Sequence, residues 1–231
     1  MAKGQRRKLN GRRNGRARRQ ARHQITWPEF LYLLLIAAVG SWLLLRPADW
    51  LGPNDPARRT HPLTLDEART INAGIPFVAG PLRPAKPFRF RGSHAAKLQA
   101  TDCLATAALY EAGMDGRGQK AVIQVVLNRA RHPGFPKTIC GVVYQGSSRR
   151  TGCQFTFTCD GSVYRRRVKT GWDAARKAAR RALDGYVFPP VGTATHYHTD
   201  WVVPYWSGSL DKVAKVNTHI FYRSRRLSGR L

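Results

Sequence analysis

The chain has 231 residues, with 40 Lys and Arg against 13 Asp and Glu, which gives a formal net charge of +27. This length allows one or two domains. A charge of this sign and size is typical of proteins that meet an anionic polymer or an anionic membrane surface. The basic residues are densest in residues 1–28, which contain no acidic residue.

An uncharged apolar segment, Phe30 to Leu45, follows this basic tail. We predict a single-pass transmembrane anchor over residues 29–46. A cleaved signal peptide is the alternative, but the basic segment is unusually long for one and apolar residues continue past Ala38 and Gly40. The positive-inside rule then predicts that residues 1–28 lie in the cytoplasm, touching anionic lipid, and that the remainder lies in the periplasm or cell envelope.

Residues 47–99 are rich in proline and show little sustained periodicity. We predict a linker that holds the following domain away from the bilayer. One short helix is expected within it, at residues 63–74, because Thr64 and Glu67 have the spacing of a capping box and Gly74 marks an end.

Residues 100–231 have the pattern of a compact domain with its own core. Three helices are expected, at residues 101–113, 118–131 and 170–185. The second is apolar around most of its circumference and is therefore expected at the centre. Alternating residues predict a half-buried strand at 153–164, and aromatic and β-branched stretches predict short strands at 193–208 and 217–223. The predicted fold class is α+β, dominated by helices.

Four cysteines lie in this domain, Cys103, Cys140, Cys153 and Cys159. An even number in an exported domain predicts two disulfides, with three possible pairings that the sequence does not separate. Reduced buried thiols are the alternative. A zinc site is disfavoured because no CxxC pair is present.

Glu111 is the only glutamate after Glu67, and it falls on the face that the first helix of the domain is expected to bury. Gly113 follows at once, so Glu111 is expected at the C-terminal end of that helix. Desolvation and the negative end of the helix dipole both raise the pKa of a carboxyl group in such a place. A protonated glutamate of this kind serves as a general acid. The alternative is a surface or capping glutamate paired with an arginine.

Several separate motifs resemble, in order, the cell wall hydrolase family of the spore cortex-lytic enzymes. They are "EAGMDGRGQKAVIQVVLNRARHPGFPKTICGVVYQ", "CQFTFTCDG", "ATHYHTDWVVPYW" and "HIFYR", and the resemblance covers about residues 101–223. The resemblance implies a lysozyme-like, transglycosylase-type fold and cleavage of peptidoglycan between N-acetylmuramic acid and N-acetylglucosamine. It also implies that Glu111 is the catalytic glutamate and that Gly118 and Gln119 match the family's G-Q.

The chain departs from the family pattern just after Glu111. Gly113 stands where the family has arginine, the turn is about one residue shorter, and Asp115 is the nearest acid in place of a second glutamate. One carboxyl group is enough for a lytic transglycosylase, whereas ordinary glycosidases need two. The sequence therefore favours lytic cleavage over hydrolysis, with Asp115, Asp160 and Asp200 as possible second carboxylates. A non-catalytic peptidoglycan-binding protein is the alternative.

The resemblance also supplies candidates for sugar binding. Gln154 and Thr156 match the family's Q-F-[ST] and Tyr144 its V-Y-Q, so their polar groups are candidates to bind sugar hydroxyl or acetamido groups. Trp201 and Tyr205 are candidates to stack on sugar rings. Packing in the core is the alternative for these aromatic residues, and Asp115 is a further candidate for substrate binding.

The histidines and the net charge fit two other functions. His196, His198 and His219 would be the ligands of a metal-dependent amidase, but there is no HExxH and we expect structural histidines, with no metal and no cofactor. Nucleic-acid binding fits the charge alone. We do not expect it, because the charge is densest beside the apolar segment and no nucleic-acid-binding module is recognisable. The expected partners are peptidoglycan and the membrane.

Overall fold

The computed structural model describes residues 27–44, 62–149, 152–165 and 170–225. The chain divides into two compact units, residues 1–53 and 54–231. The first unit contains helix α1 (Trp27–Leu44), which overlaps most of the predicted anchor, while most of the basic tail lies outside the described residues. No helix within the described ranges is long and apolar enough to cross a membrane. The structure therefore does not confirm the predicted span.

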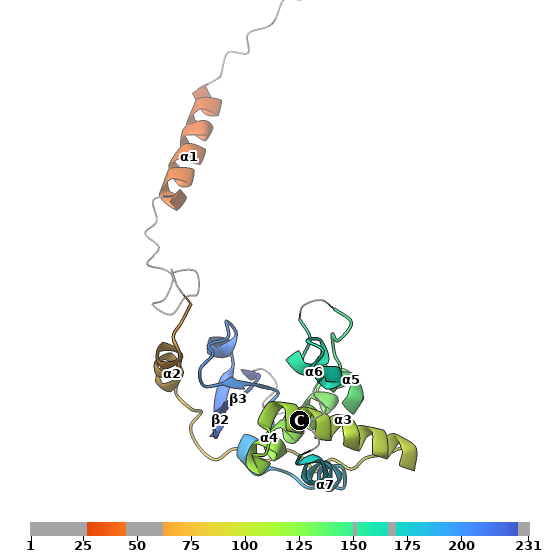
Figure 1. The fold of residues 1–231 in the computed structure, drawn as a ribbon. Coiled ribbons are helices and arrows are strands. Elements are labelled where there is room, and N and C mark those ends of the chain that lie inside the picture. The colour runs from red at the N-terminus through yellow and green to blue at the C-terminus, as the bar shows by residue number, and fades with distance from the viewer. Residues whose placement is uncertain (1–26, 45–61, 150–151, 166–169, 226–231) are drawn as a thin grey trace, which may run out of the picture. The chain divides into compact units, whose positions relative to one another are not determined.

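The second unit is built mainly of helices, with a small sheet near its C-terminal end (Figure 1). The helices are α2 (Leu65–Gly74), α3 (His94–Ala112), α4 (Gly116–Arg131), α5 (Ile139–Val143), α6 (Ser162–Arg165) and α7 (Trp172–Leu183). The strands are β1 (His196–Thr199), β2 (Asp211–Val216) and β3 (His219–Arg223). Short 3-10 helices occupy Thr156–Thr158, Pro189–Val191 and Ser207–Ser209. This confirms the helix-dominated α+β class.

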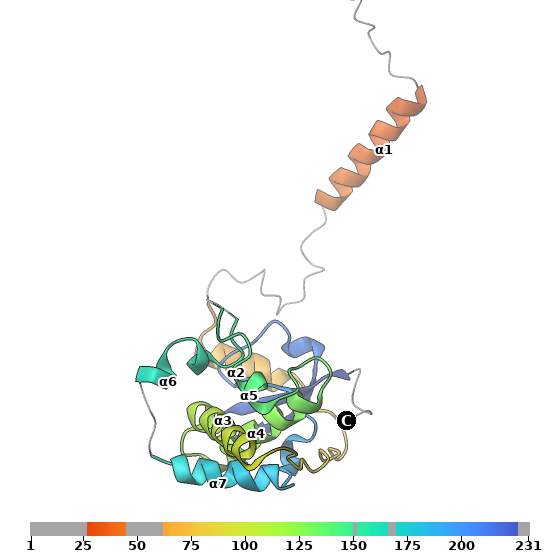
Figure 2. The same ribbon diagram turned by 90° about the vertical axis from the view of Figure 1, so that its right-hand side faces the viewer.

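Helices α3 and α4 form the centre of this unit, with α7 on one side and α5 on the other (Figures 1 and 2). The main core joins these four helices through Leu104, Val122, Val126, Val142 and Leu183, all almost fully buried. Most of α4 is buried, as its apolar circumference predicted. Alanines on the facing sides of α3 and α7, among them Ala108 and Ala179, leave little side chain between the helices and allow close packing.

The sheet has the order β1-β3-β2 and is antiparallel throughout. Phe221 of β3 packs against Val125 of α4 in a second core cluster. Helix α4 also carries buried polar residues that hold the segment leading into β1. The Asn128 side chain donates hydrogen bonds to the carbonyls of Gly192 and Ala194, at 3.0 and 2.8 Å. Since buried polar groups need partners, these bonds fix the position of β1 relative to α4.

Residues 62–93, which belong to the predicted linker, pack onto the domain instead of extending away from it. The Asn72 side chain donates to the carbonyls of Asp200 and Val202, at 2.8 and 2.9 Å. The Lys212 ammonium donates in turn to the Asn72 carbonyl, at 2.6 Å. The predicted capping box of Thr64 and Glu67 is present at the start of α2. A hydropathy pattern does not show buried polar contacts of this kind. The sequence therefore predicted a linker where the structure has a segment packed onto the domain.

The strand predicted at 153–164 is wrong. A 3-10 helix and α6 take its place, and Asp160 accepts a hydrogen bond from the Ser162 N–H at 2.7 Å. The alternation that favoured a strand does report burial, because Phe155 and Phe157 are buried and Thr156 is exposed. A disulfide between Cys153 and Cys159 closes the segment into a loop, which is incompatible with an extended strand. The second disulfide joins Cys103 of α3 to Cys140 of α5, so two disulfides form as predicted.

Candidate active site

Glu111 lies in the last turn of α3 and is half-buried. The helix ends because Gly113 adopts a φ of 53°, in the left-handed region that favours glycine, and its N–H donates to the Leu109 carbonyl at 2.9 Å. The glycine that departs from the family pattern is thus the residue that ends the helix. The sequence correctly placed Glu111 at the C-terminal end of a partly buried helical face.

Tyr197 of β1 reaches the Glu111 side chain. Its hydroxyl donates a hydrogen bond to Glu111 Oε2 at 3.0 Å. The Tyr197 ring lies against Phe221 and His219, with ring centroids 5.5 Å apart in both pairs. Tyr197 was not predicted as a site residue, although it lies in the motif "ATHYHTDWVVPYW". The signal was the two-residue period of "HYHT", which directs Tyr197 away from the face that carries His196 and His198.

Arg129 supplies a buried positive charge beside this pair. Its side chain is 3% exposed, and its Nε donates to the Thr195 carbonyl at 2.6 Å. The guanidinium carbon lies 5.3 Å from the centre of the Phe135 ring and 5.6 Å from that of Phe155. Burial lowers the pKa of Arg129 to about 10, while Tyr197 and Glu111 act to raise it. Arg129 therefore stays charged at neutral pH.

The groups around Glu111 have opposing effects on its pKa. Burial raises the pKa of Glu111 above its usual value, and the Tyr197 hydrogen bond and the Arg129 charge oppose this rise. Burial also raises the pKa of Tyr197 well above its usual value, so its hydroxyl remains a donor. The site thus favours a protonated glutamate and also stabilises the carboxylate that forms once the proton has left. A group of this kind can act first as an acid and then as a base.

The residues that match the family's G-Q hold the turn after Glu111. The Gln119 side chain is buried, and its amide donates to the Gly113 carbonyl at 2.5 Å. A Cβ on Gly118 would lie 2.5 Å from Asp115 Oδ2 and 3.0 Å from Ala112 Cβ, so no larger residue fits without a shift. These two residues therefore set the path of the chain from the end of α3 into α4.

The three aspartates proposed as second carboxylates each have a structural task. Asp115 caps α4, accepting from the Arg117 N–H at 3.0 Å and from Asn217. Burial acts to raise the pKa of Asp115, but hydrogen bonds from the Gly118 N–H and Asn217 bring it below its usual value. Asp160 caps α6, as described above. Asp200 pairs with Lys215 at 2.7 Å and with Arg69 at 3.5 Å.

The predicted sugar-binding residues of the Q-F-T segment lie on a loop that packs against the Glu111 region. Phe157 stacks on Tyr110, the neighbour of Glu111, with ring centroids 4.8 Å apart, and Phe155 contacts Arg129. Gln154 is half-buried and Thr156 is exposed. Tyr144, which is 37% exposed, lines a separate cavity of about 350 Å³ together with Ser147, Ser148, Thr158, Cys159, Gly161 and Val163.

The other predicted residues lie around the sheet. Trp201 and Tyr205 belong to the loop after β1 and are 38% and 89% exposed, so neither is a core residue. His198 is buried, with Nε2 3.0 Å from the Tyr222 hydroxyl and Nδ1 2.9 Å from the Thr199 carbonyl. Both of its ring nitrogens thus have protein partners, as expected of a structural histidine. In the described ranges, no three His, Cys, Asp or Glu residues are grouped to hold a metal ion.

Fold and site together define a helix-dominated α+β domain built around a single desolvated glutamate. Comparison with known proteins shows which families and structures this domain is similar to. The model of the Cell Wall Hydrolase family matches residues 113–222, the same family that the sequence motifs resemble. The match begins at Gly113, two residues after Glu111, and so does not include Glu111.

Curated relatives are spore cortex-lytic enzymes. The one from Bacillus cereus is 32% identical over 105 residues, covering 45% of this chain and 36% of that enzyme. The one from Halalkalibacterium halodurans is 34% identical over 105 residues, covering 45% and 28%. The one from Bacillus subtilis is 29% identical over 104 residues, covering 45% and 30%. The chain therefore aligns with about a third of the length of these relatives.

Two solved structures are also similar. The catalytic domain of the Bacillus cereus SleB protein gives a TM-score of 0.44 at 28% identity, covering 58% of this chain and 95% of that one. The catalytic domain of the germination-specific lytic transglycosylase SleB from Bacillus anthracis gives a TM-score of 0.44 at 27% identity, covering 58% and 99%.

Proposed function

We propose that this domain cleaves the glycan strands of peptidoglycan between N-acetylmuramic acid and N-acetylglucosamine, by lytic transglycosylation with Glu111 as acid and base. The observation that carries the proposal is the environment of Glu111, which is half-buried, bonded by the Tyr197 hydroxyl at 3.0 Å and close to the buried charge of Arg129. The family match and the cortex-lytic relatives support the substrate class.

The proposed reaction proceeds in two proton transfers. Protonated Glu111 gives its proton to the glycosidic oxygen, and the bond from that oxygen to C1 of the muramoyl sugar breaks. The Glu111 carboxylate then takes the proton of the muramoyl 6-hydroxyl while that oxygen bonds to C1. The product is a 1,6-anhydro sugar and no water is consumed. Tyr197 and Arg129 stabilise the carboxylate between the two transfers.

The engagement of Asp115, Asp160 and Asp200 elsewhere supports the lytic route over hydrolysis. A hydrolase needs a second carboxylate within about 5–10 Å of the acid, either as nucleophile or as base for water. In the described part of the domain, these three candidates hold helix caps or ion pairs. A lytic transglycosylase needs only the group that Glu111 provides.

Product analysis tests this proposal. Purified sacculi are digested with the full chain, and the released fragments are identified by mass spectrometry. Anhydromuropeptides are the expected products. Reducing-end muropeptides would instead mean hydrolysis, and free stem peptides would mean an amidase. Binding to sacculi without release of any fragment would favour the non-catalytic alternative.

We further propose that the domain acts outside the cytoplasm. Two disulfides are formed, and disulfides persist in oxidising compartments. Attachment to the cytoplasmic membrane by residues 29–46, with residues 1–28 inside, stays a prediction from the sequence. Fractionation of cells that express the full chain, with protease added from outside, tests both location and orientation.

A further inference from the structure

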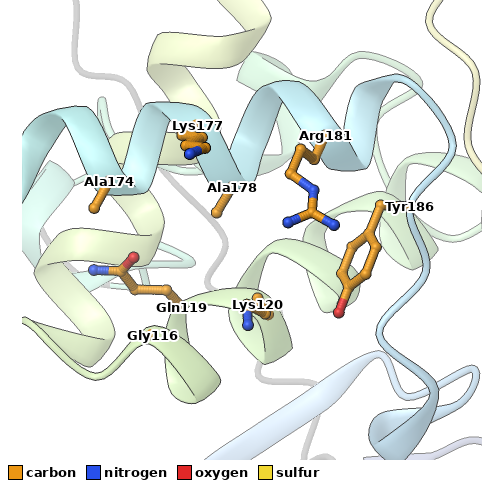
Figure 3. Close-up of a pocket in the computed structure, with 8 residues that line it drawn as sticks. All are labelled: Gly116, Gln119, Lys120, Ala174, Lys177, Ala178, Arg181 and Tyr186. Atoms are coloured by element: carbon orange, nitrogen blue, oxygen red, sulfur yellow. The ribbon is translucent and has the colours of Figure 1, made fainter.

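A cavity of about 220 Å³ lies between α7 and the first turns of α4, apart from the side chains of Glu111, Tyr197 and Arg129. Figure 3 shows this pocket. Its lining comes from α4, from α7 and from the segment after α7, and consists of Gly116, Gln119, Lys120, Ala174, Lys177, Ala178, Arg181 and Tyr186. None of the functional residues predicted from the sequence lies in it.

The pocket carries positive charge without an acidic residue in its lining. Lys120, Lys177 and Arg181 line it, and among the residues that the structure describes none of the three forms an ion pair. Acidic side chains do occur nearby: Asp102 pairs with Arg176, Asp184 pairs with Lys97, and Asp173, one turn before Lys177 on α7, is exposed and forms no ion pair with Lys177. The three cationic side chains of the pocket are therefore available to bind a negatively charged group from outside the described chain.

The shape of the pocket favours one small group over an extended flat surface. Ala174 and Ala178 are one helical turn apart on α7, and Figure 3 shows both directed toward α4, where their small side chains leave the space open. The Arg181 guanidinium lies 5.0 Å from the centre of the Tyr186 ring, which limits its orientations. The lining of the pocket is thus partly apolar, at Ala174 and Ala178, and partly cationic, at Lys120, Lys177 and Arg181.

The pocket is close to the turn that follows Glu111. Gln119 lines the pocket and also holds the Gly113 carbonyl. Gly116, another lining residue, is five positions after Glu111. Five residues span at most about 18 Å, and this segment turns, so the pocket is nearer than that. A peptide of about five residues attached to a sugar beside Glu111 has the same reach.

We propose that this pocket binds a carboxylate of the stem peptide attached to the glycan strand. The inference rests on the proposed function, because that function defines the polymer. Charge complementarity and the short distance from Glu111 support a carboxylate carried by the substrate itself. The pocket then holds the peptide and leaves the glycan free to lie at Glu111, so that strands bearing peptides bind more tightly than bare strands.

Binding to two kinds of soluble glycan strand tests the proposal. Strands of matched length are prepared with stem peptides intact or removed by an amidase, and their affinity is measured for the full chain carrying Glu111→Gln, so that no cleavage intervenes. In that background, Lys177→Gln with Arg181→Gln is the pocket variant. Arg117→Gln with Arg180→Gln is the control, since these exposed residues of the same two helices lie outside the pocket.

The pocket variant is expected to bind peptide-bearing strands about tenfold more weakly, as two lost charge contacts imply, with bare strands almost unaffected. The control pair is expected to change neither by more than about twofold. Equal weakening for both strand types, an equal effect of the control pair, or no effect would each overturn the proposal. The proposal would also be overturned if the chain bound vesicles of anionic lipid and only the pocket variant lost this binding. The pocket would then be a site for lipid phosphate.

Two further measurements keep the outcomes separate. Urea unfolding of each variant shows whether a loss of binding reflects loss of the fold. Lys120→Gln is a second pocket variant, and it leaves the contact between Arg181 and Tyr186 in place. Cleavage of sacculi by the unmodified chain is measured in parallel. If cleavage fails but the preference for peptide-bearing strands persists and needs the pocket, the pocket proposal stands and the proposed catalysis falls.

Discussion

The Tyr197 hydroxyl donates to the Glu111 carboxyl group at 3.0 Å, and this contact joins the sheet to the end of α3. It brings together two residues that are 86 positions apart in the sequence. The hydrogen bond opposes the effect of burial on Glu111, because it favours the carboxylate form while burial favours the acid. The Tyr197 hydroxyl therefore lowers the pH at which Glu111 loses its proton, against the effect of burial.

Tyr197→Phe is expected to move the alkaline limb of the pH–rate profile to higher pH. Glu111 must be protonated for the first step, so activity falls as pH rises through its pKa. Loss of the hydrogen bond removes an influence that lowers this pKa, so the proton is retained to higher pH. Maximal activity is expected to fall, because the carboxylate intermediate loses a donor.

The measurement is kcat/KM on soluble glycan strands across the pH range. Tyr222→Phe is the matched control, since it removes a hydroxyl from the neighbouring strand that lies 3.0 Å from His198 Nε2 and is not bonded to Glu111. A limb that stays in place or moves to lower pH in Tyr197→Phe would show that the hydroxyl does not stabilise the Glu111 carboxylate.

Gly118→Ala is expected to destabilise the turn that follows Glu111. The added Cβ would lie 2.5 Å from Asp115 Oδ2, which caps α4, and 3.0 Å from Ala112 Cβ. Overpacking of this kind costs about 1–3 kcal/mol in the free energy of unfolding. Urea unfolding measures the cost, and glycan cleavage is expected to fall as well, because the path after Glu111 shifts.

Gly116→Ala serves as the control for stability. Gly116 is in the same first turn of α4, and a Cβ there would meet no atom within 4 Å. Its unfolding free energy should stay equal or rise slightly, because alanine restricts the unfolded chain. Equal losses in the two variants would mean that the clash with Asp115 is not the cause.

Removal of the two disulfides should have unequal effects on stability. Cys103 and Cys140 are 37 positions apart, whereas Cys153 and Cys159 are separated by 6. The chain-entropy model gives about 4 kcal/mol for the longer loop and about 2 kcal/mol for the shorter one. Paired Cys→Ser variants in urea unfolding measure both. A larger loss for Cys153 and Cys159 would contradict this account.

The sequence predicted the parts of the site that depend on local pattern. The helices that hold Glu111 and Gln119 follow from apolar periodicity, and the end of α3 follows from Gly113. Tyr197 and Arg129 were missed because their roles depend on the approach of β1 to α3 and α4. That approach is set by buried polar contacts, such as those of Asn128 with the carbonyls of Gly192 and Ala194.

The same reason explains the segment predicted as a linker. Its prolines indicate a spacer, but the Asn72 side chain donates to the Asp200 carbonyl and Lys212 donates to the Asn72 carbonyl, and these buried hydrogen bonds attach the segment to the sheet region. Hydropathy reports which residues avoid water, and it does not report which polar groups satisfy one another. The strand predicted at 153–164 failed in a different way, because the pairing of Cys153 with Cys159 could not be chosen from the sequence.

The role of Glu111 is the central claim, and the release of anhydromuropeptides from sacculi by the full chain and by Glu111→Gln tests it most directly. Glutamine keeps the size of the side chain and can still accept from Tyr197, but it has no proton to give to the glycosidic oxygen. We predict that the variant unfolds at an unchanged urea concentration and releases anhydro products about 10²–10⁴-fold more slowly. Release at the unmodified rate by the folded variant would contradict the account.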